Sequence, residues 1–321
     1  MSDALPFVSI IIPTRPGQAD IPAVTAARAL DYPKDRLEII VARGKQPAVQ
    51  RNAAIKAARG ELIYFLDDDS RAQPDNLRCA RAHFKDPQVK MLGGPNLCPT
   101  DAPPLEQVFA VVLGSWLAFG PSRARYDSIG VARPSGEKEL ILCNMVARRA
   151  DLLELGGFDE SLYPTEENAL MDELQKRGAK LIYDPQFIVH RRPRPTLRSF
   201  CKMLFTYGRG RAEQFRLHPT PGSALNFVPP LFCVYLVATP LLVLAFGPIV
   251  FAPLALYLLA VIGQTAFLMS SKGFLRSLLA SPLLVGSHVF YGLGFCRGLF
   301  TKLKSPGEKP ATEVNLEKVS P

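Results

Sequence analysis

The chain has 321 residues, of which 48% are hydrophobic, with a formal net charge of +9 and six cysteines. This length fits one large domain or two smaller ones, and the cysteines lack CxxC spacing, which predicts reduced thiols rather than a metal or redox pair. The basic residues concentrate between Arg191 and Arg216, just before an apolar region, which favours an anionic membrane face over nucleic acid. No zinc-finger, RNP or helix-turn-helix pattern supports a nucleic-acid partner.

Short apolar runs alternate with helical patterns along the first half of the chain. They predict strands at 8–14, 37–41, 62–66 and 89–94 and helices at 20–30, 47–59 and 74–84. This alternation is typical of a parallel sheet with right-handed crossovers. Further along we expect a helix at 105–119, a mobile loop at 121–138, strands at 140–146 and 180–183, helices at 149–155 and 168–177, and a run at 187–190 that extends the sheet edge.

Three successive carboxylates, Asp67, Asp68 and Asp69, follow the apolar run at 62–66. In open α/β sheets, ligands bind where strands leave the sheet at their carboxyl ends. Adjacent acids repel one another and need compensation when they are buried. A hard divalent cation, Mg²⁺ or Mn²⁺, prefers such oxygen ligands and commonly bridges carboxylates to phosphates. The simpler alternative is a solvated acidic turn.

The last third of the chain is rich in long apolar stretches, which predict a membrane-embedded region. Residues 225–246 and 249–269 are each long enough to span a bilayer, and the basic residues around them predict a hairpin with both ends in the cytoplasm. A third apolar stretch, 278–295, spans the membrane or is re-entrant. Residues 191–216 interleave basic with aromatic side chains, as in an amphipathic helix at a membrane interface, although a solvated basic helix has a similar composition.

The two ends of the chain are polar. Residues 1–6 carry no signal-peptide pattern, so we expect the soluble part to stay in the cytoplasm. Residues 305–321 predict a disordered tail.

Several motifs, in order, resemble family 2 glycosyltransferases of the GT-A fold. They are "VSIIIPT" at 8–14, "QRNAAIKAARGELIYFLDDDS" at 50–70, "RRADLLELGGFDESL" at 148–162 and "TEENALMDEL" at 165–174. The run "HRRPRPTLRSFCKMLFTYGRGRAEQF" at 190–215 is similar to the bacterial succinoglycan-type (ExoA-like) branch. The resemblance covers about residues 7–216.

The resemblance implies an α/β chain in four parts. A cytoplasmic GT-A catalytic domain with a Rossmann-like, mostly parallel sheet occupies 1–190. A basic amphipathic interface segment at 191–222, a membrane region of two to three helices at 223–300 and a polar tail at 301–321 follow.

The resemblance also implies residues that bind the donor and the metal. Asp69 is the first choice for a direct metal ligand, whereas Asp67 contacts the ribose or the water shell of the metal. The residues assigned to the nucleotide and the donor sugar are Thr14, Arg15, Arg51, Asp67, Asp68 and Asn144. His190 reaches the metal or the phosphates in a closed state, unless it is an ordinary structural histidine.

The base that takes the acceptor proton is implied to lie in the run Glu166-Glu167-Asn168. The family usually has Glu-Asp here, so Glu167 falls on the catalytic position and Glu166 is the substitute. The alternative is that these are helix N-terminal acids favoured by the macrodipole, with Thr165 as the N-cap. Asp159, in the turn before this run, is expected to be structural or to lie near the acceptor.

One departure from the family pattern concerns the nucleobase. The family commonly has an aspartate after the second strand, whereas this chain has Arg43 and Lys45 there. Either the base is recognised elsewhere or the donor differs from the usual UDP-sugar.

Together these features predict an inverting, metal-dependent glycosyltransferase in the bacterial inner membrane, with several membrane passes. It would transfer a sugar from a nucleotide-diphosphate donor to a lipid-linked (polyprenyl) saccharide in exopolysaccharide or surface-glycan assembly. Membrane lipids and a second copy of the chain are the further partners considered. The alternatives are a polyprenyl-phosphate sugar synthase and a membrane-anchored pseudoenzyme; a processive synthase is disfavoured because the chain has no Q-x-x-R-W motif.

Overall fold

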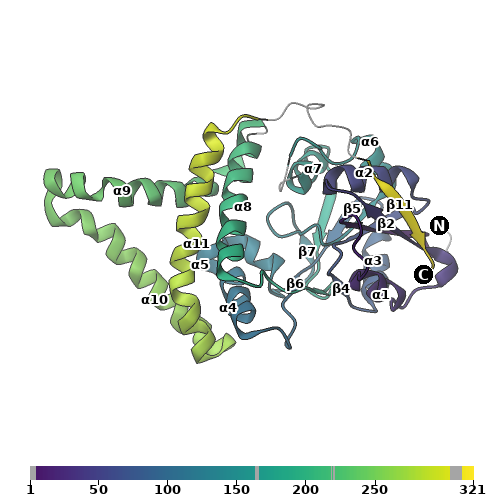
Figure 1. The fold of residues 1–321 in the computed structure, drawn as a ribbon, viewed down its shortest axis with the longest axis horizontal. Coiled ribbons are helices and arrows are strands. Elements are labelled where there is room, and N and C mark those ends of the chain that lie inside the picture. The colour runs from purple at the N-terminus through teal and green to yellow at the C-terminus, as the bar shows by residue number, and fades with distance from the viewer. Residues whose placement is uncertain (1–4, 163–165, 218, 220, 304–312) are drawn as a thin grey trace. The chain divides into compact units, whose positions relative to one another are not determined.

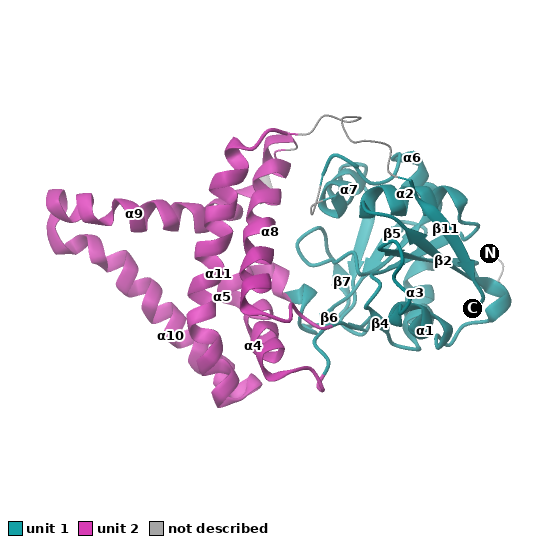
Figure 2. Ribbon diagram, in the orientation of Figure 1, with its two compact units in different colours: residues 1–99, 124–191, 304–321 teal, residues 100–123, 192–303 magenta. Residues whose placement is uncertain are grey.

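The computed structural model describes residues 5–162, 166–217, 219, 221–303 and 313–321. The chain divides into two compact units, coloured separately in Figure 2. Unit 1 contains residues 1–99, 124–191 and 304–321, and unit 2 contains residues 100–123 and 192–303. The units differ from the predicted parts in two places, because residues 100–123 belong with the C-terminal helices and the C-terminal segment belongs with unit 1.

Unit 1 is built on an eight-stranded sheet with the order β11-β2-β1-β3-β8-β5-β9-β7. Strands β11, β2, β5 and β7 of this sheet are labelled in Figure 1. The strands are β1 (Val8–Thr14), β2 (Leu37–Arg43), β3 (Leu62–Leu66), β5 (Val89–Gly93), β7 (Arg133–Pro134), β8 (Asn144–Arg148), β9 (Lys180–Tyr183) and β11 (Asn315–Val319). The sheet is mixed: β1 pairs in parallel with β2 and β3, and β5 with β9, whereas β8 lies antiparallel between β3 and β5. The carboxyl ends of β1, β2 and β3 therefore meet at one edge.

Helices cover both faces of this sheet, because successive side chains of a strand point to opposite faces. Along β1, Ile10 and Ile12 belong to one core cluster and Ile11 to the other. The first cluster includes residues of α1 (Pro22–Arg28) and α3 (Asn76–Phe84). The second includes residues of α2 (Pro47–Ala57), α6 (Arg149–Glu154) and α7 (Glu166–Lys176). Both α1 and α2 have a proline in the first turn, where no intrahelical N–H is lost.

Three sequence expectations are corrected in unit 1. Residues 187–190 do not extend the main sheet: β10 (Val189–His190) pairs with β4 (Arg71–Ala72) and β6 (Asn96–Leu97) in a second, three-stranded sheet. The strand expected at 140–146 begins only at Asn144. The loop expected at 121–138 contains the 3₁₀ segment η2 (Gly120–Arg125) and strand β7; η1 (Lys34–Arg36) is a second such turn.

The C-terminal segment is also not wholly disordered. β11 pairs antiparallel with the edge strand β2 from Asn315 opposite Arg43 to Val319 opposite Ile39. Val319 and Leu316 pack against the two core clusters, one on each face of the sheet. β11 is a short strand whose side chains alternate between the two faces of the sheet, and its partner strand lies far away in the sequence. Such a strand is hard to recognise without the structure.

Unit 2 is helical. Its helices are α4 (Pro104–Leu113), α5 (Trp116–Phe119), α8 (Leu197–Leu217), α9 (Val228–Phe246), α10 (Ala252–Lys272) and α11 (Phe274–Phe300), with 3₁₀ turns η3 (Pro221–Phe227) and η4 (Gly247–Phe251). Helices α8 and α11 pack very closely. A Cβ added at Gly208 would lie 2.0 Å from the Tyr291 carbonyl oxygen, and one at Gly294 would lie 2.0 Å from that of Phe205.

Two stretches of unit 2, Ser223–Lys272 and Phe274–Phe300, are long and apolar enough to cross a membrane. Helices α9 and α10 leave large side chains exposed, among them Leu241, Leu244 and Leu256, each more than two-thirds accessible. Such exposed leucines are expected where lipid surrounds a helix.

Candidate active site

The acid triplet lies at the carboxyl end of β3, where two arginines pair with its first and third carboxylates. Arg51 of α2 places Nη2 3.1 Å from Asp67 Oδ1, and Arg191, which follows β10, places Nη1 3.0 Å from Asp67 Oδ2. The Nε of Arg191 is 2.5 Å from Asp69 Oδ1. Compensation in this structure therefore comes from two side chains that are distant in sequence.

One guanidinium bridges Asp67 and Asp69, so both carboxylates face a common cation position. Burial works to lower the pKa of Arg191, but the two carboxylates override it and hold that pKa above its ordinary value. Burial raises the pKa of the intervening Asp68, with Asp69 and Asp67 adding to the effect against a hydrogen bond from Gln18. A divalent cation requires such oxygens around one point. The donor set at Asp67 and Asp69 therefore fits a metal.

The sequence Gln50-Arg51-Asn52 supplies three different links around this site. Gln50 Nε2 donates to the Thr14 carbonyl at 2.8 Å and to the Ala42 carbonyl, which joins the ends of β1 and β2. Arg51 reaches the acids. Asn52 faces a turn, where its Oδ1 accepts from Phe158 N–H at 2.8 Å and its Nδ2 donates to the Phe158 carbonyl and to Glu160 Oε1, each at 2.9 Å.

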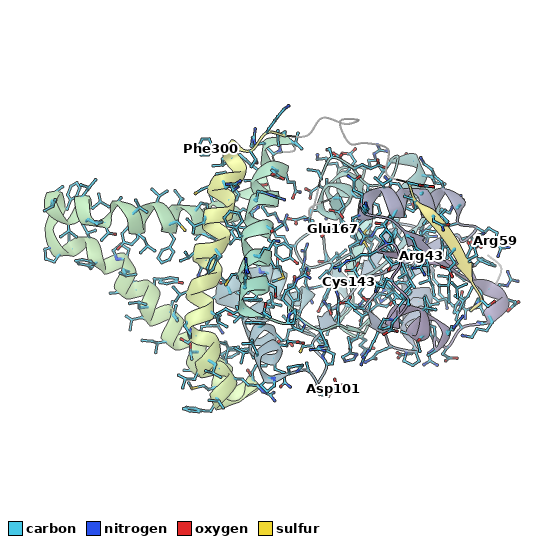
Figure 3. The ribbon with its side chains drawn as sticks, viewed as in Figure 1. Arg43, Arg59, Asp101, Cys143, Glu167 and Phe300 are labelled. Atoms are coloured by element: carbon cyan, nitrogen blue, oxygen red, sulfur yellow. The ribbon has the colours of Figure 1, made fainter. Side chains whose placement is uncertain are left out.

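Glu166, at the start of α7, belongs to the same network. Its Oε1 lies 3.2 Å from Arg51 Nη1, so Arg51 joins Glu166 to Asp67. Burial, followed by the neighbouring Glu167, raises the pKa of Glu166 to about 7 against the opposing charge of Arg51. Glu167 is more accessible than Glu166 and is labelled in Figure 3. Thr165, the expected N-cap, lies outside the described residues.

Within the part of the chain that the structure describes, three buried polar atoms of these residues have no hydrogen-bond partner: Thr14 Oγ1, Arg51 Nε and Glu166 Oε2. Buried polar atoms are normally paired, so unpaired ones at a candidate site are expected to meet a ligand or water.

The nucleotide-side candidates lie at the ends of β1 and β2. Arg15 and Lys45 are exposed beyond these strands. Arg43, labelled in Figure 3, is already engaged, because its Nη1 donates to the Gln18 carbonyl at 2.7 Å and its Nε lies 3.1 Å from Glu317 Oε2 of β11.

Asn144 lies inside the protein rather than at the surface of the site. Its Oδ1 accepts from the Tyr64 hydroxyl at 3.0 Å, and its Nδ2 donates to the carbonyls of Phe187 and Pro95 at 2.6 and 3.2 Å. Its side chain thus fixes β8 and the adjacent loops. Burial raises the pKa of its neighbour Cys143 to about 12, so the thiol stays protonated.

His190 is not grouped with the carboxylates of the triplet. Burial and Arg71 lower its pKa. Among the described residues, the ion pairs of Asp67 and Asp69 are with arginines and none is with His190. Within the described ranges, the only group of three or more potential ligands found close together is Cys79, His83 and Asp184.

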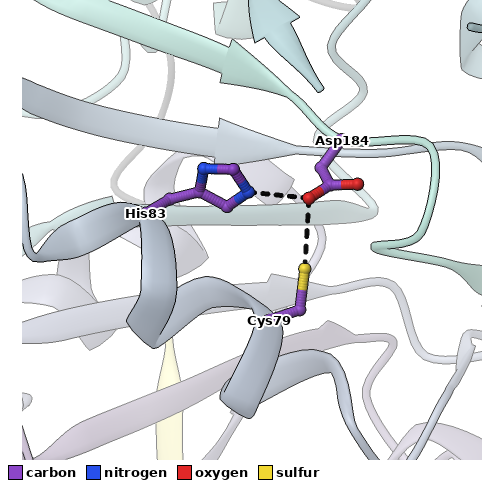
Figure 4. Close-up of side chains that lie close together, drawn as sticks. All are labelled: Cys79, His83 and Asp184. Carbon is purple, nitrogen blue, oxygen red and sulfur yellow. Dashed lines mark hydrogen bonds and ion pairs between the residues drawn. The ribbon is translucent and has the colours of Figure 1, made fainter. Parts of the chain in front are cut away.

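That group is already satisfied by hydrogen bonds (Figure 4). His83 Nε2 lies 2.7 Å from Asp184 Oδ2, and Cys79 Sγ donates to the same oxygen at 3.3 Å. Asp184 Oδ1 accepts from Gln186 N–H at 2.9 Å. The three side chains hold the loop after β9.

Sequence reasoning missed the role of two residues. The sequence pattern indicates Arg191 only as the start of the basic segment and Asn52 only as part of a motif. The available signal for Arg191 was its position directly after a strand, in a chain whose acid triplet needs a cation.

A polar, acid-rich site at the carboxyl ends of strands lies where open α/β sheets bind their ligands. The model of the "Glycosyl transferase family group 2" matches residues 62–270, which is more than half of the chain. The "Glycosyl transferase family 2" model matches residues 22–98. The chain belongs to glycosyl transferase family group 2, which confirms the predicted enzyme class.

Two relatives place the chain in context. It is 27% identical over 192 residues to the pre-mycofactocin glycosyltransferase of Mycobacterium tuberculosis, covering 56% of this chain and 37% of that protein. It therefore spans little more than a third of the length of this curated relative. The mannosyltransferase PcManGT from Pyrobaculum calidifontis, solved with GDP-Man and Mn²⁺, is 18% identical with a TM-score of 0.54, over 93% of this chain and 88% of that one. This likeness confirms the predicted GT-A fold.

Proposed function

We propose that the protein transfers a sugar from a nucleotide-diphosphate donor to an acceptor hydroxyl, with inversion at the anomeric carbon. The observation that carries this proposal is the shared cation position between Asp67 and Asp69, which lies within one network with Arg51 and Glu166. Such a transfer requires the leaving diphosphate to be neutralised and the acceptor proton to be removed.

Asp69 and Asp67 would hold a divalent ion, Mg²⁺ or Mn²⁺, which would neutralise charge on the diphosphate. The bridging guanidinium of Arg191 supports this assignment, since it occupies the position between the carboxylates. Once displaced, Arg191 is free to pair with a phosphate oxygen, because a guanidinium matches phosphate geometry. Thr14, Arg15 and Arg51 would position the nucleotide. Asn144 would support the site from the protein interior rather than contact the donor. His190 would reach the metal or the phosphates only after a conformational change.

Glu167 is our proposed base, with Glu166 as its positioning partner. Glu166 is buried and bonded to Arg51, whereas Glu167 is more accessible and so better able to meet an acceptor. A single base on the side opposite the leaving group corresponds to inversion.

The acceptor we propose is a lipid-linked saccharide at the cytoplasmic face of the inner membrane. The long apolar helices with exposed leucines support a membrane location, and the basic face of α8 supports an interface position.

Nucleotide release from a panel of sugar nucleotides tests this function. We expect release with Mn²⁺ or Mg²⁺ that chelation abolishes and that Asp69→Asn lowers at least tenfold. Asp101→Asn, at an exposed aspartate of unit 2, is the matched control. Nucleotide binding without turnover of any donor, in the presence of a lipid extract, would instead identify the chain as a pseudoenzyme.

A further inference from the structure

A second group of potential metal ligands in unit 1 consists of residues other than the acid triplet (Figure 4). Cys79 and His83 are one turn apart on α3, at positions i and i+4, which share a face of a helix. Asp184 follows β9 and is 105 residues away from Cys79 in the sequence. Each of the three side chains brings one ligand atom to within 4.8 Å of the other two.

The Asp184 carboxylate is held so that one of its oxygens faces both partners. Its Oδ1 accepts from Gln186 N–H at 2.9 Å. Its Oδ2 lies 2.7 Å from His83 Nε2 and accepts from Cys79 Sγ at 3.3 Å. Carboxylates that bind metals are commonly fixed by a hydrogen bond of their own. The loop after β9 therefore presents Asp184 Oδ2 to α3 in the manner of a metal ligand.

The mixture of sulfur, nitrogen and oxygen indicates which ion would fit. Zn²⁺ binds cysteine, histidine and carboxylate side chains, commonly with four ligands in a tetrahedral arrangement, whereas Mg²⁺ prefers oxygen. Zinc bonds at tetrahedral angles place the ligand atoms roughly 3.3–3.6 Å apart. The distance from Cys79 to Asp184 is already in this range, and that from His83 to Asp184 has to lengthen by about 0.6 Å. The terminal torsions of histidine and aspartate are broad, so these side chains can make the adjustment.

We propose that Cys79, His83 and Asp184 bind Zn²⁺, with a water molecule as the fourth ligand. Cys79 and His83 are half-buried and the His83 side chain is 23% exposed, so the ion and the water can enter from that side. On binding, the S–H bond of Cys79 breaks and the proton passes to solvent, while neutral His83 carries its proton on Nδ1 instead of Nε2. The thiolate, the carboxylate and the ion then sum to zero net charge.

The ion would join α3 to the loop after β9. Asn76, which lies on the same face of α3 as Cys79 and His83, already holds this loop. Its Oδ1 accepts from Ile188 N–H at 3.2 Å, and its Nδ2 donates to the Ile188 carbonyl at 2.8 Å. The loop leads to β10 and to Arg191, so zinc would fix the segment that carries an arginine of the candidate active site. The inference goes beyond the proposed function and does not depend on it.

Cobalt tests this site, because Co²⁺ occupies zinc sites and its absorption reports a bound thiolate. The experiment adds Co²⁺ to chelator-treated full-length protein in detergent, without a sugar donor and with excess Mg²⁺ to occupy sites made of oxygen alone. We expect a saturable thiolate-to-cobalt absorption band in the near ultraviolet. Zn²⁺ should abolish this band by displacing Co²⁺, and Zn²⁺ should raise the melting temperature of the wild type.

Variants of the ligands assign the band to this site. Cys79→Ser should lose the band, and both Cys79→Ser and His83→Gln should bind Zn²⁺ at least tenfold more weakly than the wild type. Cys98→Ser, which removes another half-buried thiol of unit 1, is the matched control and should behave like the wild type.

The proposal is overturned if the wild type shows no thiolate-to-cobalt band. It is also overturned if Cys79→Ser keeps the band or if Cys98→Ser loses it, since the thiolate would then lie elsewhere. If Cys79→Ser does not fold, alkylation of the wild type with and without Zn²⁺, mapped by mass spectrometry, decides the question. Protection of Cys79 by Zn²⁺ would support the site, and equal labelling of Cys79 in both samples would exclude it.

Discussion

At the scale of single residues, the central feature is that arginines occupy the place where a metal is expected. Arg191 bridges Asp67 and Asp69, and Arg51 joins Asp67 to Glu166. Asp67 and Asp69 are thus paired without an ion, and a metal would have to compete with a tethered cation. This competition gives the first prediction.

Replacing Arg191 by glutamine should change how metal stabilises the protein. The variant loses the cation shared by two carboxylates, so without metal we expect a loss of about 1–2 kcal/mol of stability, moderated by partial exposure. Added Mn²⁺ should raise the melting temperature of Arg191→Gln more than that of the wild type. Thermal unfolding in detergent, with and without Mn²⁺, measures both effects. An equal Mn²⁺ effect in the two proteins would contradict the shared cation position.

Glu166 gives a prediction about pH. Its pKa in the folded protein is raised to about 7, above the ordinary value of 4.5, so the unfolded chain ionises first. Stability should therefore fall as pH rises between these two values and then level off, by about 1–3 kcal/mol. Glu166→Gln removes this ionisation but keeps an oxygen for Arg51, so its stability should vary less with pH. Melting curves from about pH 5 to about pH 8 measure how the stability of the wild type, Glu166→Gln and the control Glu167→Gln varies with pH. Parallel curves for the wild type and Glu166→Gln would exclude a raised pKa.

The sequence indicated the identity of the acids but not their partners. Asp67 and Asp69 could be predicted because three adjacent carboxylates after a buried strand are unusual. Arg191 could not, because an ion pair across 122 residues depends on where β10 lies in the folded protein. The partners of Asn144 could not be predicted for the same reason, since its three hydrogen bonds go to segments distant in sequence.

At the scale of elements, the turn after α6 depends on contacts with α2. Gly156 and Gly157 both have positive φ, +80° and +86°. A Cβ at Gly157 would lie 2.3 Å from Asn52 Oδ1, whereas one at Gly156 would meet nothing within 4 Å. Substitutions at Gly156 and Gly157 therefore distinguish the effect of backbone strain from the effect of a collision with Asn52.

Gly157→Ala should cost more stability than Gly156→Ala. Both variants carry the strain of a positive φ, about 1 kcal/mol. Only Gly157→Ala also displaces Asn52, which leaves buried backbone groups of Phe158 without partners at a cost of about 1–3 kcal/mol. Denaturant unfolding measures the difference between the variants. Equal losses would mean that Asn52 does not hold this turn.

The elements agree with the sequence prediction where the local pattern is strong, as in the apolar runs of β1, β2 and β3 and the mixed basic and aromatic pattern of α8. They were missed where pairing partners are distant. β10 belongs to a separate small sheet, and β11 completes the main sheet from the far end of the chain. Both strands are short, so tertiary pairing rather than local pattern decides their structure.

At the scale of the whole molecule, the pairing of β11 limits how the chain could cross a membrane, as we propose that it does. β11 follows the apolar helices in sequence, yet it pairs with β2, which precedes them. Both strands must therefore lie on the same side of the membrane, so the number of crossings is even. An α9–α10 hairpin satisfies this condition, since helices of 19 and 21 residues are about 28 and 31 Å long. Helix α11, which packs on α8, would then add no crossing.

Reporter fusions at the two ends of the chain test whether the number of membrane crossings is even. We expect a reporter that is active only in the cytoplasm to work at either end. A reporter placed in the α9–α10 turn, near Gly247, should be active only on the other side. Activity of a C-terminal reporter on that other side would show an odd number of crossings and would exclude the pairing of β11 with β2.

The most direct test of the central claim is metal-dependent nucleotide release by the wild type and by Glu167→Gln. The assay uses detergent-solubilised protein, Mn²⁺ or Mg²⁺, a lipid extract as the source of acceptor, and the sugar nucleotide that the wild type prefers. Removing a positioned general base costs typically 10²–10⁴-fold in rate. We predict a loss in this range for Glu167→Gln, with donor binding unchanged. Release by Glu167→Gln at the wild-type rate would contradict the account.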